Sequence, residues 1–219
     1  MSKFTINNPA FLSMAGNISR MSTNTFYVEA IEDSTTITFG AKEYVEVSTN
    51  DSNYELAPES VVLNSGDRLF IKVNTISSMT SNMGNPFEVD KVFNVGGECP
   101  LIHYAIEEDG TLMEIYMFYV FANSNVVDAS DLIIDMKSDN GDFLYPSFSK
   151  CTSLIAAPQL PSRTLTSSCY EGMFQDCTSL TTAPELPATT LAERCYCSMF
   201  KGCTSLTTAP ELPATTLAD

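Results

Sequence analysis

The most constraining feature of the sequence is a 16-residue stretch, CTSLTTAPELPATTLA, which occurs at 177–192 and again without change at 203–218. A looser copy begins at 148, and other positions keep the same 26-residue period: Cys151/Cys177/Cys203, Leu154/Leu180/Leu206, Leu160/Leu186/Leu212 and Leu165/Leu191/Leu217. A fixed period between 20 and 50 residues is typical of repeat proteins, whose units bury their apolar sides only against neighbouring units. The period therefore predicts a solenoid of 26-residue units.

Each unit has two parts with different expected structures. Thr190 followed by Glu193 is the spacing of a helix capping box, and Gly202 is well placed to end the helix. The apolar positions between them fit one stripe of an amphipathic helix: Leu191, Cys195, Met199 and Phe200. The prolines in SLTTAPELPA exclude a helix there and predict a short strand and bend, with Leu180, Ala183 and Leu186 facing inward. The expected repeat region is α/β.

Five of the seven cysteines, Cys151, Cys169, Cys177, Cys195 and Cys203, follow the apolar phase of the repeat, which favours small buried hydrophobic residues over disulfides or metal ligands. Cys195 and Cys197 form a lone CxC, and the one histidine, His103, is far away in the sequence. His103 stands in an apolar segment and is expected in the core or a turn. No metal and no cofactor are predicted.

Residues 26–116 read as an antiparallel, sandwich-like β domain, because short alternating or apolar runs are separated by turn residues. Asn64–Asp67 is a tight-turn signal between two such runs. Residues 1–25 are a polar arm that is disordered or anchors on a partner. The repeats take 117–219: a degenerate first one at about 121–147, clear ones from 148, and a truncated last one. Aligning Phe121 with Phe148 places Val127 and Ile133 in the phases of Leu154 and Leu160.

The charge balance limits the function. The formal net charge is −16, which argues against binding nucleic acid or an anionic membrane. No segment approaches the roughly 20 apolar residues of a membrane span, and the N-terminus lacks the apolar run of a secretory leader. An active site is a set of residues that occurs once in a chain, whereas every residue of an exactly duplicated unit occurs at least twice. A hydrolase with two carboxylates is an alternative, and no enzyme is predicted.

The unit CTSLTTAPELPATTLA, followed by the CYxxMFxGC pattern, resembles the BspA-type leucine-rich repeats of gut-bacterial surface proteins and of gut-phage (crAss-like) virion proteins. The segments FYVEAIEDSTTITF, VVLNSGDRLFIK and KVFNVGGECPLIHY resemble a β domain that precedes such repeats. The resemblance implies adhesion or display through the solenoid, without catalysis.

The expected function is therefore a phage virion fibre or a capsid or tail decoration protein, assembled in the host cytoplasm. The arm would contact other virion proteins, the repeats would bind a host surface glycan or protein, and the chain would form a homo-oligomer. The alternative is a bacterial cell-surface or secreted adhesin. The expected ligand-binding residues are outward positions of the repeated strand: Gln159, Thr182, Glu185, Thr208 and Glu211. A solvated strand face without a ligand is the other interpretation of these rows.

Overall fold

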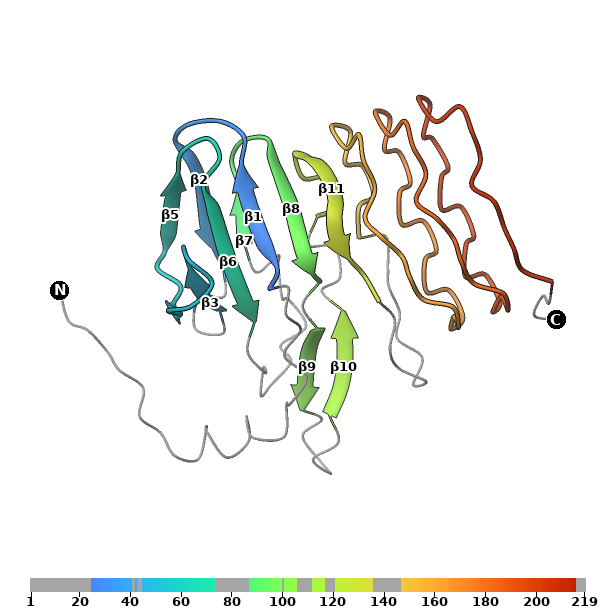
Figure 1. The fold of residues 1–219 in the computed structure, drawn as a ribbon, viewed down its shortest axis with the longest axis horizontal. Coiled ribbons are helices and arrows are strands. Elements are labelled where there is room, and N and C mark those ends of the chain that lie inside the picture. Colours follow the sequence, from blue (N-terminus) through green and yellow to red (C-terminus); the bar gives the residue numbers. More distant parts are fainter. Residues whose placement is uncertain are drawn as a thin grey trace.

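The computed structural model describes residues 25–40, 42, 45–73, 87–99, 101–105, 112–116, 121–135 and 147–215. The predicted arm, apart from Thr25, lies outside the described residues. The chain is mainly β (Figure 1). Its strands are β1 (Tyr27–Ala30), β2 (Thr35–Phe39), β3 (Val45–Ser48), β4 (Glu55–Leu56), β5 (Ser60–Leu63), β6 (Arg68–Val73), β7 (Phe87–Val89), β8 (Phe93–Glu98), β9 (Leu101–Ala105), β10 (Leu112–Tyr116) and β11 (Val126–Ile133).

The larger sheet has six strands in the order β11-β8-β1-β6-β3-β4, and the smaller has three in the order β5-β2-β7. The buried residues of both sheets belong to one apolar cluster, in which Phe26 lies 6.1 Å from Phe87 between ring centroids. The short alternating runs predicted as strands are confirmed. The turn at Asn64–Asp67 is also confirmed, because Asp67 N donates to Asn64 O at 3.0 Å and Gly66 has a φ of 86°.

Strands β9 and β10 form a separate antiparallel hairpin. His103 pairs with Glu114 in its backbone register. Its side chain lies outside the described residues, so its predicted place in a core or turn stays a prediction. Every pairing among β1 to β10 is antiparallel, whereas β11 runs parallel to β8.

Strand β11 joins the sheet to the repeat region. It pairs with β8 on one side, and on the other side Asp128 and Ile133 form parallel bridges to Ala156 and Gln159. Figure 1 shows the later copies continuing this row beyond β11. One apolar cluster accordingly runs from Phe26 to Cys203.

The phase predicted for Val127 and Ile133 is wrong by one residue. Val126 and Ile134 are the buried positions, at 0% and 1% exposure, and Ile133 instead pairs with Gln159. Register shifts interrupt β11 between Val126 and Asp131, and a uniform 27-residue offset cannot describe such a strand.

The predicted helix is wrong, since residues 147–215 contain no helix. Turns occupy 167–176 and 193–202 instead. In the first of these segments, alternate backbone N–H groups donate to a carbonyl 25 residues later, at 2.7 to 3.0 Å: Ser168 to Glu193, Tyr170 to Cys195, Gly172 to Cys197, Phe174 to Met199 and Asp176 to Lys201. The intervening N–H groups donate three residues back within their own copy. Backbone bonds therefore join one copy to the next.

The cause is a left-handed residue at every fourth position. Ser168, Gly172 and Asp176 have φ between 60° and 63°, and the next copy repeats this at Arg194, Ser198 and Gly202. Such residues break an α-helix but fit a series of tight turns. The capping box is also wrong, because Thr190 forms a parallel bridge to Thr164.

The interior of the repeat region is made of matched rows of side chains. One row stacks Phe121 on Phe148 at 4.8 Å between ring centroids, then Phe174 at 5.8 Å and Phe200 at 5.7 Å. In a second row, Cys177 and Cys203 each donate a thiol hydrogen bond of 3.0 Å to a phenylalanine carbonyl of the preceding copy. The rows bind each copy to its neighbour through packing and through buried polar contacts.

Candidate functional site

The five predicted ligand-binding residues are all exposed. Thr182 pairs with Ala156, and Thr208 and Glu211 occupy the matching positions one copy later than Thr182 and Glu185. Gln159 lines a cavity. Whether the repeated rows bind a ligand stays a prediction, and the cavity beside Gln159 is a separate candidate site.

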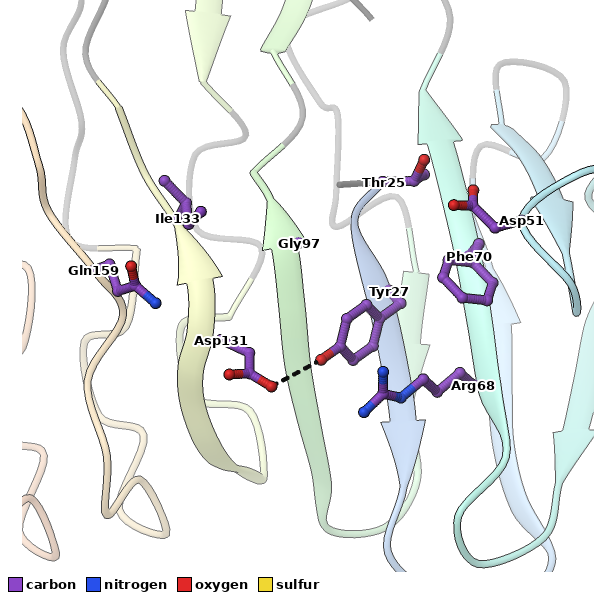
Figure 2. Close-up of a pocket in the computed structure, with 9 residues that line it drawn as sticks. All are labelled: Thr25, Tyr27, Asp51, Arg68, Phe70, Gly97, Asp131, Ile133 and Gln159. Atoms are coloured by element: carbon purple, nitrogen blue, oxygen red, sulfur yellow. Dashed lines mark hydrogen bonds between the residues drawn. The ribbon is translucent and has the colours of Figure 1, made fainter. Parts of the chain in front are cut away.

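This cavity, called the groove below, has a volume of about 400 Å³ and is open to solvent. Figure 2 shows its lining residues, which come from β1, β6, β8, β11 and their flanking segments, with Asp51 contributed by the loop between β3 and β4 and Gln159 by the first clear repeat. They are Thr25, Tyr27, Asp51, Arg68, Phe70, Gly97, Asp131, Ile133 and Gln159. The groove therefore lies where the six-stranded sheet meets the repeats.

Strand alternation places Tyr27 and Phe70 on the outer face of the sheet. Tyr27 lies between the core residues Phe26 and Val28, and Phe70 between Leu69 and Ile71, so both rings point away from the core. The two rings meet edge to face at 5.9 Å between centroids. The groove thus has aromatic walls that the hydrophobic core does not use.

Two glycines of β8 let the Tyr27 ring and the Thr25 backbone pack closely against this strand. Tyr27 pairs with Gly96, and a Cβ at Gly96 would lie 2.3 Å from the Tyr27 hydroxyl oxygen. Gly97 has a φ of 83°, and a Cβ there would lie 2.2 Å from the carbonyl oxygen of Thr25. Only glycine permits both close approaches.

A polar network crosses the groove. The Tyr27 hydroxyl donates to Asp131 Oδ2 at 3.2 Å, as the dashed line in Figure 2 marks, and the Arg68 guanidinium lies 4.3 Å from the centre of the Tyr27 ring. Arg68 also pairs with Glu29, and this hydrogen bond raises the pKa of the guanidinium. Burial raises the pKa of Tyr27, so the phenol stays protonated and remains a donor. Gln159 Nε2 donates to Ser130 O at 2.9 Å.

Asp51 occupies the opposite side of the groove, beside Phe70 (Figure 2). One of its carboxylate oxygens accepts a hydrogen bond from the Tyr54 hydroxyl, and burial together with this bond raises the pKa of Tyr54 to about 12. Asp51 has a φ of 55°, which asparagine and aspartate tolerate better than most residues. The groove thus has acceptors on both sides of its aromatic walls.

The thiols of the repeat region are poor candidates for nucleophiles. Burial raises the pKa of Cys151 to about 11 and of Cys169 to about 12, and it raises the pKa of Cys177, Cys195 and Cys203 as well. These five cysteines are buried and free, as the sequence predicts, whereas Cys99 is half-buried and Cys197 is exposed. A thiol that stays protonated does not attack an electrophile.

Thiol labelling is expected to separate Cys197 from the other six cysteines. In native protein at pH 8, iodoacetamide should modify Cys197 at least about 100-fold faster than the buried thiols, because only an accessible thiolate reacts. Peptide mapping by mass spectrometry measures this. Comparable labelling of Cys169 or Cys177 without denaturant would contradict the buried rows.

Replacing Gly97 with alanine is expected to cost about 2–3 kcal/mol of stability, since it adds a backbone clash to the strain of a positive φ. Gly66→Ala is the matched control, because Gly66 has a φ of 86° and nothing within 4 Å of its missing Cβ. The control should cost about 1 kcal/mol, the strain alone. Equal losses in urea unfolding would mean that the close approach of Thr25 is not rigid.

Sequence reasoning missed Tyr27, Arg68, Asp51 and Asp131 as members of one site. The outward positions of the predicted strands carried the signal, since YVEA and RLFIKV place Tyr27, Glu29, Arg68 and Phe70 on the polar face. What joins them to Asp131 is the parallel pairing of β11 with β8, and the strand pattern alone does not give that pairing.

Among the described residues, no three His, Cys, Asp or Glu side chains are grouped so that they could hold a metal ion. The part of the chain that the structure describes also contains no helix long and apolar enough to cross a membrane. Comparison with protein-family models, curated proteins and solved structures found no match to this chain.

Proposed function

We propose that this chain is a non-enzymatic structural and adhesion protein, in which the β domain forms a base and the repeats form a solenoid of leucine-rich-repeat type. The observation that supports it best is the set of backbone hydrogen bonds between residues 25 apart, because the bonds repeat the same contact from copy to copy. Such an array gains surface by adding copies, and the exposed Thr182/Thr208 and Glu185/Glu211 positions repeat with it.

The proposed setting is a phage virion, with the chain as a fibre or as a capsid or tail decoration. Support comes from the resemblance of the CTSLTTAPELPATTLA units to those of virion and surface proteins. Residues 1–25 would contact other virion proteins, the chain would assemble as a homo-oligomer, and the repeats would face the host surface. The alternative setting is a bacterial cell surface, where the same exposed rows would serve an adhesin.

Two measurements test this proposal. Mass spectrometry of density-purified particles should find the chain at a fixed ratio to the major capsid protein, and its absence from particles but presence on cell envelopes would favour the alternative. Purified protein incubated with host cells should bind them saturably without releasing soluble reducing sugar. Release of sugar above the level of a heat-denatured control would contradict the non-enzymatic role.

A further inference from the structure

The groove has the size and construction of a ligand site. Its volume of about 400 Å³ falls within the range of about 300–1,000 Å³ typical of small-molecule pockets. Gly97 and the rings of Tyr27 and Phe70 line it, and Gly96 lets the Tyr27 ring lie close against β8. Phe70 is only half-buried, so part of its ring remains available to an apolar surface of a ligand.

Donors and acceptors face the groove together. The Nη groups of Arg68 donate no hydrogen bond within the described residues, because its contact to Glu29 uses Nε. Among the described residues, Asp131 accepts from Tyr27 through Oδ2, and Asp51 accepts from Tyr54 through one oxygen. The second oxygen of each carboxylate is therefore available to a ligand. A hydroxyl group can satisfy both kinds of partner, since it donates and accepts.

The charges in the groove select against anionic ligands. Glu29 already balances Arg68, so Asp51 and Asp131 leave a local excess of negative charge that repels anions. A cation would be expected over the Tyr27 ring, but the guanidinium of Arg68 occupies that position. A ligand that is neutral, rich in hydroxyl groups and apolar on one face matches the exposed part of the Phe70 ring together with the donors and acceptors around it.

We propose that the groove binds a neutral saccharide, with its ring against Phe70 and its hydroxyl groups between Arg68, Asp51 and Asp131. This inference rests on the proposed adhesive function and gives it a binding site and a ligand class. It places recognition at the junction of sheet and repeats, where Gln159 contributes, rather than along the repeated rows that the sequence favours.

The test is binding of the full chain to a printed array of neutral oligosaccharides of glucose, galactose, mannose, fucose and N-acetylglucosamine, beside sialylated, uronate-containing and phosphorylated glycans. Neutral glycans should bind, and titration of the best one should shift the amide resonances of Thr25, Gly97 and Asp131. The double variant Asp51→Asn/Asp131→Asn keeps shape and backbone preference, and it should weaken binding about ten-fold or more. Its urea midpoint, compared with that of the wild type, shows that it is folded.

The matched control is Thr182→Ala/Glu185→Ala, which alters the repeated rows and leaves the groove intact. This control should bind like the wild type. Saccharide binding that the control loses and the groove variant retains would overturn the groove as the site while leaving the adhesive function in place. Binding of acidic glycans only, or of no glycan, would overturn the inference, and the cell-binding and particle measurements would still decide the proposed function.

Discussion

Replacing Phe148 with alanine is expected to lower the free energy of unfolding by about 3–5 kcal/mol, whereas Phe200→Ala is expected to cost about 1–2 kcal/mol. Both are phenylalanines of the same row in the repeat region. Phe148 is 0% exposed and has ring neighbours on both sides, Phe121 and Phe174. Phe200 is half-buried, and among the described residues its ring stacks on Phe174 alone.

Urea unfolding of the two variants beside the wild type measures this difference, and Phe200→Ala is the matched control because it removes the same atoms from a copy of the same unit. The position of Phe148 makes the result informative, since it connects the row to Phe121 and through it to Phe26 of the sheet region. Equal losses, or a smaller loss at Phe148, would contradict the account of one core shared by the sheets and the repeats.

Alkaline pH is expected to unfold the protein between about pH 9 and pH 11, where the arginine side chains are still protonated. The thiols cause this effect: their ordinary pKa is 9.0, and burial raises it to about 11 at Cys151 and about 12 at Cys169. The unfolded chain therefore releases thiol protons that the folded chain holds. Because the folded state binds more protons, stability falls as pH rises, by about 1.4 kcal/mol per pH unit for each such thiol.

Circular dichroism and urea unfolding at intervals from pH 8 to pH 11 measure this decline. The stabilising effect of the raised pKa values is fully present below about pH 9 and is lost as pH rises toward the folded pKa values of about 11 and about 12. Cys169→Ala should flatten the decline, and Cys197→Ser, at an exposed thiol, should not change it. Constant stability up to pH 11 would contradict the burial of these thiols.

The sequence was sufficient for the elements whose pattern is local. Alternating apolar runs correctly predict strands, and Asn64–Asp67 correctly predicts a turn, because both depend on neighbouring residues. The burial of Cys151, Cys177 and Cys203 also follows from their shared 26-residue phase. What the phase does not reveal is the hydrogen bond from each thiol to a phenylalanine carbonyl of the preceding copy.

The helix prediction failed over a small difference in period. Cys169, Met173 and Cys177 are spaced by four residues, as are Cys195, Met199 and Cys203. An α-helix has 3.6 residues per turn, so a strict spacing of four drifts around it, whereas a series of four-residue turns keeps such residues on one side. The groove could not be predicted from the sequence for another reason. It depends on the register of β11 against β8, which is a contact between segments far apart in the sequence.

Residue-resolved amide hydrogen exchange tests the central claim, that copies join through alternate backbone N–H groups. All N–H groups from Ser168 to Asp176 have partners, so this segment should be protected throughout. In the last described copy, the N–H groups of 195, 197, 199 and 201 donate within the copy, whereas those of 194, 196, 198, 200 and 202 have no acceptor among the described residues. We expect alternating slow and fast exchange across 194–202 and continuous protection across 168–176. The same continuous pattern in both segments, as two helices would give, would contradict it.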